Sequence, residues 1–445
     1  MNRRHFLEAG LIGGLGALAL PSLTAASREQ HVFRQDGNGR MITRPYKTDL
    51  NELAAEYRRQ LFDEYLPFWE NGGYDEERGG FMCYLHDDGS VQDDRKDIWY
   101  QGRGIWVYSF LHNNIDSNPK WLEMATKSRD FTVRHMHRGD GTWIDTVDRF
   151  GEPVEGIDAS RDGNIYGALF AAVGLIQLAR ATGSDEDIQL AKKTIRKAVE
   201  RYEEPTYAGV TVPETGETGL RAQGHSFMFV WVAPQLLEID SDPWFESLAR
   251  EHLDHIHEHF WNPEFGISNE VLFHDYSRIP GLGDQMAPGH SIETQWMAMV
   301  AARQFGDASW AGVFQDRMRR LIEMSWDYVF GGIGDTDYRV FAGESHATGP
   351  DFSIKSMWAQ TEVLIGTMRV YAQTGDLWAL DWYERAWEYV QGTMTTEYGV
   401  WRQAVDRFGE PVNRPGISPY RKGNFHQPRC LMMNLLDVEA MMDDG

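Results

Sequence analysis

The eight-residue word VDRFGEPV occurs twice in this chain, at 147–154 and again at 405–412. An aromatic residue precedes each copy, Trp143 in the first case and Trp401 in the second, and a polar loop and an apolar stretch follow. An identical word at two distant places indicates internal repetition, in which one supersecondary unit recurs and neighbouring units bury a common core. The chain is therefore limited to folds built from an array of similar units.

Glycine-marked turns recur roughly every 64 residues and divide the chain into six units. They lie at 80–81, 141–143, 209–210, 266–267, 332–333 and 399–400. In each unit an amphipathic, charge-rich helix precedes the turn, and a second, more apolar helix follows a polar loop. The first helices are predicted near 50–70, 119–137, 185–203, 243–260, 309–329 and 378–394. The second helices are predicted from Ile98 onward and near 162–181, 222–238, 290–305, 355–374 and 423–441.

Six half-exposed helices and six more buried ones predict two concentric rings. The expected fold is an all-α (α/α)6 toroid, a barrel of six helix-pair repeats with short β-hairpins at one mouth. The long loops and the N-terminal ends of the inner helices should meet at that mouth. Free N–H groups and the positive ends of the helix dipoles make this mouth the expected position of a binding site.

The first 27 residues do not follow the repeat. Arg3 and Arg4 precede an apolar, Gly/Ala-rich run at 9–20, which is typical of a twin-arginine export signal. We expect residues 1–27 to be a signal peptide, with export to the periplasm. The run is too short for a membrane anchor, so no membrane partner is expected after cleavage. Residues 28–48 are predicted as a polar N-terminal arm and residues 49–445 as a single catalytic domain.

Charge and motif content exclude several classes of function. The net charge of −24 argues against nucleic acid or an anionic membrane as a partner. Cys83 and Cys430 are too few for a disulfide framework, and we expect free or buried thiols. The histidine-rich stretch HLDHIHEHF at 252–260 lies among acidic residues on a first helix, and a solvated face is favoured over a metal site. No nucleotide, metal or redox fingerprint follows the signal, so no cofactor is expected.

Polar and aromatic residues stand at the start of each inner helix. They are Arg103 in unit one, Tyr166 in unit two, His225 in unit three, His290 and Glu293 in unit four, Trp358, Gln360 and Glu362 in unit five, and His426 and Arg429 in unit six. Any one of them alone is explained as a helix cap, a structural ion pair or a core residue. The repeat places them at comparable positions around one axis, which favours a shared site. Histidine is suited to moving protons near neutral pH.

Four of these helix starts resemble the N-acylglucosamine 2-epimerase (renin-binding protein) family. The motifs are WYQGRGIWVYSF at 99–110, APGHSIETQW at 287–296, KSMWAQTE at 355–362 and NFHQPRCLMM at 424–433. The resemblance covers essentially the whole chain after the signal and implies the same barrel fold. It also implies a sugar 2-epimerase or aldose–ketose isomerase, a reducing-sugar substrate and a homodimer.

The resemblance carries over to individual positions. It implies that His290 and His426 are the acid/base pair and that Arg103 lies beside the C1–C2 oxygens of the sugar. Glu293, Glu362 and Arg429 match polar positions that orient the histidines or bind substrate. His225 matches a third histidine of the cellobiose-type branch. Tyr166, Trp358 and Gln360 are expected to contact the substrate.

These residue types suit epimerisation at C2 of an open-chain sugar. Removal of the weakly acidic C2 proton gives an enediolate, which a fixed cation such as Arg103 would stabilise. Two histidines on opposite faces would take the proton and return it with inversion. Return to C1 would give a ketose, so the isomerase outcome stays open. An inverting glycosidase would need two opposed carboxylic acids, and a sugar-binding scaffold would need no histidine pair. Both are less favoured.

Overall fold

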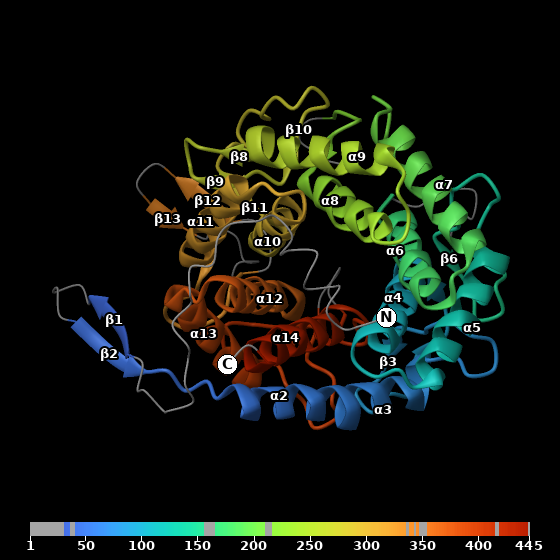
Figure 1. Ribbon diagram of the computed structural model, residues 1–445, viewed down its shortest axis with the longest axis horizontal. Helices are drawn as coiled ribbons and strands as arrows, with labels where there is room; N and C mark the ends of the chain where they lie inside the picture. The colour runs from blue at the N-terminus through green and yellow to red at the C-terminus, as the bar shows by residue number, and fades with distance from the viewer. Residues whose placement is uncertain are drawn as a thin grey trace.

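The computed structural model describes residues 31–35, 41–154, 165–209, 216–334, 338–341, 344–346, 354–413 and 418–443. Within these residues, six inner and six outer helical segments wind into a closed ring (Figure 1). The predicted (α/α)6 toroid is therefore confirmed. The predicted signal peptide, residues 1–27, lies outside the described residues.

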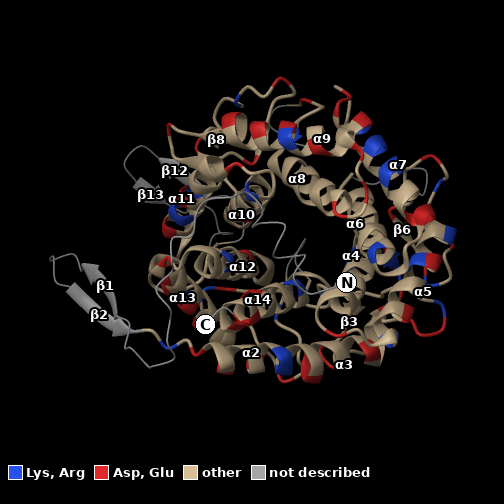
Figure 2. Ribbon diagram, in the orientation of Figure 1, with Lys and Arg blue, Asp and Glu red and all other residues tan. Residues whose placement is uncertain are grey.

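The outer ring consists of amphipathic segments whose charged faces point to solvent. They are the run Leu50–Gly73 (α2 Leu50–Arg59, η1 Gln60–Tyr65, α3 Leu66–Phe68 and η2 Trp69–Gly73), α5 (Pro119–Met136), α7 (Asp185–Tyr202), α9 (Pro243–Asp254) with η3 (His255–Phe260), α11 (Ala308–Ser325) and α13 (Leu377–Thr393). Figure 2 shows the acidic and basic residues gathered mainly on this ring. Burial of one apolar face explains why each segment stays in place.

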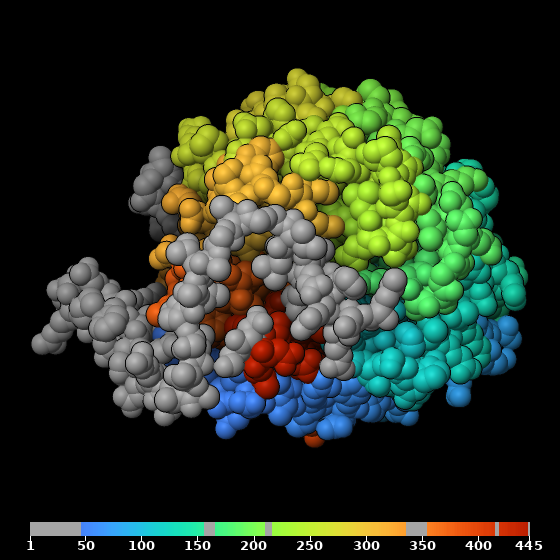
Figure 3. All heavy atoms as spheres, viewed as in Figure 1, coloured from blue at the N-terminus to red at the C-terminus, as the bar shows by residue number. Residues whose placement is uncertain are grey.

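The inner ring consists of helices that are buried on most of their circumference. They are α4 (Ile98–Asn114), α6 (Ile165–Thr182), α8 (Gln223–Leu237), α10 (Pro288–Gln304), α12 (Met357–Thr374) and α14 (His426–Asp443). Each packs against the next in chain order, and α14 also packs against α2 and α4. The space-filling view shows the same closure, with the red C-terminal residues beside the blue first helix (Figure 3). Helix α6 is apolar enough to cross a membrane, but 78% of that segment is buried inside the ring.

Short antiparallel strand pairs link neighbouring units at the mouth where the inner helices begin. The linking strands are β5 (Lys96–Asp97) with β6 (Thr146–Val147), β7 (Arg221–Ala222) with β10 (Val271–Leu272), β11 (Gln285–Met286) with β12 (Tyr338–Phe341), and β14 (Lys355–Ser356) with β15 (Ala404–Val405). A bridge from Tyr84 to Arg421 joins the first unit to the last. Strands β5, β7, β11 and β14 lead directly into α4, α8, α10 and α12, so these pairs fix the entry of the chain into those four helices.

The remaining strands are local. They are β3 (Tyr84–Leu85) with β4 (Val91–Asp93), β8 (Trp261–Asn262) with β9 (Ile267–Ser268), and β13 (Glu344–His346) beside β12. In the predicted arm, β1 (His31–Gln35) and β2 (Met41–Pro45) form an antiparallel hairpin. The arm then docks on α13, because the Glu384 carboxylate accepts hydrogen bonds from the backbone N–H groups of Lys47 and Thr48.

Both copies of VDRFGEPV form the same tight turn. In each, the aspartate carboxylate accepts hydrogen bonds from backbone N–H groups at Phe150 and Glu152 or at Phe408 and Glu410. The glycines, Gly151 and Gly409, adopt φ of 90° and 87°, which glycine accommodates without strain. The repeated word is therefore a structural device of the fold.

The cysteine prediction is confirmed, because Cys83 and Cys430 are free and buried. The prediction of a solvated histidine face at 252–260 is wrong for His252. This side chain is buried, accepts or donates a hydrogen bond with Ser226 Oγ at 3.1 Å, and packs on Phe229. The reason is helical phase, since His252 continues the buried stripe of Phe245 and Leu248.

Candidate active site

A cavity of about 390 Å³ lies where the inner helices begin. Six of the predicted site residues line it: Arg103, Tyr166, His290, Glu293, Trp358 and His426. They come from five of the six inner helices, so the closed ring is what brings them together. The volume is within the range of small-molecule sites.

Glycines in the inner-helix motifs allow the close contacts that shape this cavity. A Cβ atom on Gly289, next to His290, would lie 2.5 Å from the Trp358 ring. A Cβ on Gly102, next to Arg103, would lie 2.3 Å from the backbone carbonyl carbon of Phe170. Both distances are too short for a side chain, so glycine permits α10 to approach Trp358 and α4 to approach α6.

His426 is held by a buried carboxylate. Its Nδ1 lies 3.0 Å from Glu362 Oε1, while its Nε2 lies 3.3 Å from Arg103 Nη2. An Nδ1–H donated to Glu362 leaves the Nε2 lone pair directed toward Arg103 and the cavity. Burial, together with the charges of Arg103 and Arg429, lowers the pKa of His426 well below its ordinary value. The imidazole is therefore neutral near pH 7 and can accept a proton.

Glu362 and Glu293 share one arginine beneath the cavity. Arg429 Nη2 donates to Glu293 Oε1 at 3.0 Å and also contacts Glu362 Oε1 closely. The indole N–H of Trp296 donates to the other oxygen of Glu362 at 3.0 Å. Burial and the nearby Glu362 raise the pKa of Glu293. The network can absorb a positive charge that develops on His426.

His290 is held by a different carboxylate, in a more exposed setting. Its Nδ1 lies 2.8 Å from Glu270 Oε1, and Gln223 Nε2 donates to the second oxygen of Glu270 at 2.6 Å. The His290 side chain is 31% exposed, compared with 12% for His426. Each histidine is thus held by a carboxylate, which can stabilise a protonated imidazole, and the two differ in their exposure to solvent.

Trp358 lies between the two histidines. Its ring centroid is 4.9 Å from that of His290 and 5.9 Å from that of His426. His290 lies in the first turn of α10 in unit four, and His426 begins α14 in unit six. Trp358 lies in the first turn of α12, in unit five between them. The indole offers a face on which an apolar side of a sugar can stack.

Arg103 is a buried cation surrounded by aromatic rings. Its guanidinium carbon lies 4.2 Å from the ring centre of Phe170 and 5.0 Å from that of Phe425. Burial lowers the pKa of Arg103 to about 9, which leaves it charged at neutral pH. A desolvated cation beside His426 is placed to stabilise an oxyanion, because charge interactions strengthen where water is excluded.

Four of the predicted residues do not line the cavity. Glu362 and Arg429 lie beneath it, as described above. Gln360 gives its amide to the backbone: its Nε2 donates to the Ile333 and Ser356 carbonyls, and its Oε1 accepts from the Ile333 N–H. His225 is fully buried beside Tyr166 and Tyr202, and burial lowers its pKa to about 3. The geometry favours a supporting role for Gln360 and His225.

Other residues at the cavity do not stand out in the sequence. Trp99, Tyr100, Phe170, Phe227, Met228, Gln403 and Arg421 line it. Trp99 stacks on Tyr166 with ring centroids 5.2 Å apart. Trp99 and Tyr100 lie inside the WYQGR motif, and their place in this motif was the only sequence feature that pointed to the site. Glu270 lies between β9 and β10, and no periodic pattern marks it.

The carboxylates of this region do not match an inverting glycosidase. Among the described residues near the cavity, Glu293 and Glu362 are both bonded to Arg429, and Glu270 is bonded to His290. A glycosidase needs two acids facing the substrate from opposite sides. In the described part of the chain, no group of three or more His, Cys, Asp or Glu side chains is placed to hold a metal ion.

Fold and cavity together define an (α/α)6-barrel enzyme of the carbohydrate-epimerase class. The family model of N-acylglucosamine 2-epimerase matches residues 79–425, and the chain belongs to this family. It is 27% identical to N-acylglucosamine 2-epimerase of Bos taurus over 383 residues, 83% of this chain and 88% of that protein. It is 22% identical to cellobiose 2-epimerase of Bacteroides fragilis, over 78% and 90% of the two chains.

The solved structures agree with the fold. The structure of cellobiose 2-epimerase from Spirochaeta thermophila superposes with a TM-score of 0.73 at 19% identity, and the match covers 88% of this chain and 98% of that one. Because the chain belongs to the N-acylglucosamine 2-epimerase family, it is an isomerase of the racemase and epimerase type that acts on a sugar.

Proposed function

We propose that the protein inverts C2 of a reducing sugar of the N-acylglucosamine or N-acylmannosamine type by proton transfer between His426 and His290. The observation that carries this proposal is the pair itself. Both imidazoles border one cavity with Trp358 between them, and each has its Nδ1 bound to a carboxylate. With Nδ1 held by the carboxylate, Nε2 is the atom of each imidazole that we assign to proton transfer, and that of His426 lies 3.3 Å from Arg103 Nη2.

The surroundings assign the starting roles. His426, neutral through burial and two arginines, takes the C2 proton, and the Glu362–Arg429–Glu293 network stabilises the resulting imidazolium. Arg103 stabilises the enediolate oxygens. In this scheme the protonated form of His290, with its Nδ1 2.8 Å from Glu270 Oε1, returns a proton to the opposite face of C2. In the reverse direction the two histidines exchange roles. Delivery to C1 in place of C2 would yield a ketose.

The test is proton NMR in D₂O with N-acetylglucosamine, N-acetylmannosamine, glucose, mannose and cellobiose. Deuterium should appear at C2 of at least one sugar, and His290→Asn or His426→Asn should abolish epimer formation. His259→Asn is the matched control, because this histidine is exposed on the outer ring and should change nothing. The product, epimer or ketose, identifies the reaction. No exchange with any sugar, or full activity in both cavity variants, would contradict the proposal.

Two further proposals concern the whole protein. The twin-arginine pattern Arg3-Arg4 and the apolar run after it support export to the periplasm with residues 1–27 as the signal. Replacing both arginines by lysine should retain the protein in the cytoplasm, as judged by fractionation.

The family resemblance supports a homodimer. Sedimentation of the purified protein tests this second proposal.

A further inference from the structure

The chain contains two copies of one surface module. The first combines the loop 75–80 with the turn 148–151, and the second combines the loop 327–332 with the turn 406–409. In the loops, Asp75 and Asp327 each accept backbone hydrogen bonds from the residues two and three positions later. Each loop ends in two glycines with positive φ, and a lysine before the next inner helix binds the aspartate.

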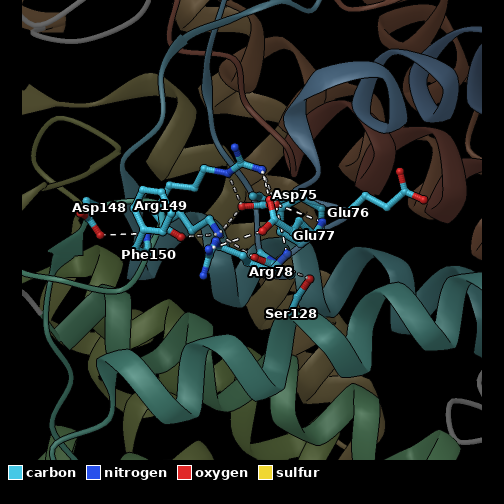
Figure 4. A network of polar contacts seen from close by, with 12 residues as sticks. Asp75, Glu76, Glu77, Arg78, Ser128, Asp148, Arg149 and Phe150 are labelled. Carbon is cyan, nitrogen blue, oxygen red and sulfur yellow. Dashed lines mark hydrogen bonds and ion pairs between the residues drawn. The ribbon is translucent and has the colours of Figure 1, made fainter.

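The side chains displayed by the two modules differ in character. The first module presents Glu76, Glu77 and Arg78, and the Arg78 guanidinium lies 4.3 Å from the ring centre of Phe150. Arg149 adds ion pairs to Asp75 and Glu77 (Figure 4). At the equivalent loop positions the second module has Tyr328, Val329 and Phe330. Phe330 packs on Phe408, the counterpart of Phe150, with ring centroids 5.5 Å apart.

This second module exposes an apolar patch. Val329 is 81% exposed, Phe408 74% and Phe330 40%, with Tyr328 at the edge. The first module shows that the same backbone is compatible with a charged surface, so the fold does not require these apolar residues. The largest exposed apolar patch of a soluble protein typically covers about 300–600 Å² and is often functional.

We infer that this patch, Val329, Phe330 and Phe408, is the centre of a two-fold interface with a second copy of the chain. The other exposed large apolar side chains of the described residues, such as Val91, Leu377 and Met442, come from separate elements. Within the described residues, the surface that best complements the patch is thus the same patch on another copy, which gives an isologous pair.

Charge also favours pairing of like patches. The chain carries a net charge of −24, so two copies repel each other unless they meet at a surface of low net charge. Arg407 and Glu410 flank Phe408, and a two-fold axis can bring the arginine of one copy toward the glutamate of the other. The exposed rings offer roughly 300–500 Å² of apolar area, which is less than the about 800 Å² per partner of a standard interface. A weak dimer is therefore expected.

This inference rests on the proposed homodimer and names its surface. The chain supplies its own test variant: Tyr328→Glu, Val329→Glu and Phe330→Arg together give the second loop the surface of the first. Because the first loop folds with those residues, the graft should preserve stability. By sedimentation velocity at about 10–100 µM, the wild type should sediment as a dimer with twice the mass of the graft, and the graft as a monomer.

Phe150→Ser, in the charged module, is the matched control and should stay dimeric. Thermal unfolding and deuterium exchange at C2 should be unchanged in the graft, which separates pairing from catalysis. Raising the salt concentration should strengthen the wild-type dimer by screening repulsion. A dimeric graft would overturn the assigned surface while leaving the homodimer intact. A monomeric wild type would overturn both.

Discussion

At the scale of single residues, the two histidines of the cavity differ in what surrounds them. His426 lies against Arg103, Arg429 and the buried Glu362, whereas His290 lies against the half-exposed Glu270. Epimerisation by two bases needs one neutral and one charged imidazole at the same pH. In the proposed scheme, burial and the two arginines keep His426 neutral, and His290 is the imidazole that carries the proton.

The low pKa of His426 makes a prediction about pH. In the proposed mechanism its neutral form is the active one, so kcat/KM should fall only when the pH drops through a value well below the ordinary pKa of about 6.5. Arg429→Met would remove a positive charge and leave Glu362 and Glu293 unneutralised, which raises the pKa of His426. The acid limb of the kcat/KM profile should then move to higher pH. An unmoved limb would show that another group controls it.

Glu270 is expected to act as a positioning residue for His290. In Glu270→Gln an amide oxygen can still accept the Nδ1–H hydrogen bond, but the charge that stabilises the imidazolium is lost. We expect kcat to fall about 10–100-fold and the alkaline limb of the pH profile to move to lower pH, with little change in the unfolding midpoint. Glu264→Gln, in the same hairpin region and exposed, is the control. A loss of activity without a moved limb would indicate a merely structural role.

At the scale of the helices and their turns, glutamines tie the inner helices to the hairpins. Gln101, Gln360 and Gln427 each bind backbone groups of a glycine-marked hairpin through both ends of the amide. The site residues Arg103, Glu362 and Arg429 follow these glutamines by two positions. These glutamine hydrogen bonds therefore fix how each helix is rotated about its own axis, and thus the direction of its site residue.

Gln360→Leu tests this role. The change leaves the N–H and carbonyl of Ile333 without their partners inside the protein, and the free energy of unfolding should fall by about 2–4 kcal/mol. Gln373→Leu, on the exposed end of the same helix, should change it by less than about 0.5 kcal/mol. Urea unfolding measures both. If Gln360 instead contacts substrate, KM will rise while stability stays constant.

The ion pair below the first hairpin predicts a pH dependence of stability. Burial raises the pKa of Asp75, but hydrogen bonds from Arg149 and Lys96 outweigh it and hold the pKa below its ordinary value. A folded pKa below the unfolded one stabilises the protein above the unfolded pKa of about 4, and this stability is lost as the pH falls toward the folded pKa. Acid titration of the unfolding free energy should show a smaller decline in Asp75→Asn than in the wild type.

The repeat explains what could be predicted from the sequence. Helices such as α5, α7 and α11 are long, periodic and capped, so their positions follow from pattern alone. The start of each inner helix located Arg103, His290 and His426. Glu270 could not be predicted, because it lies in the connection between β9 and β10 and reaches His290 only through tertiary packing. The burial of His225 and the backbone role of Gln360 depend on helix rotation, which the repeat period does not resolve.

At the scale of the whole molecule, the ring is closed by contacts between its first and last helices. Helix α14 packs against α2 and α4, Arg58 contacts Glu439, and the strand segment before α14 bonds to 83–85. The C-terminal end of α14 lies near α2 (Figure 1). Non-covalent contacts between the first and last helices therefore close the ring, and we expect the ring to form from a chain that begins at a different point.

A circular permutant tests this view of the fold. Joining Asp443 to Tyr46 through a flexible linker of about ten residues and opening the chain at Ser241, between α8 and α9, moves the break to the mouth opposite the cavity. The strand pairs at the mouth that carries the cavity all stay intact. The permutant should therefore unfold cooperatively and retain exchange at C2. Opening at Gly281 cuts the chain between Glu270 and His290. This permutant should keep the fold but lose activity, because only packing contacts then hold the Glu270 carboxylate next to the His290 imidazole. Equal activity in both permutants would mean that the strand pairs β7–β10 and β11–β12 are enough to position Glu270. Failure of the first permutant to fold would mean that closure of the ring depends on chain order.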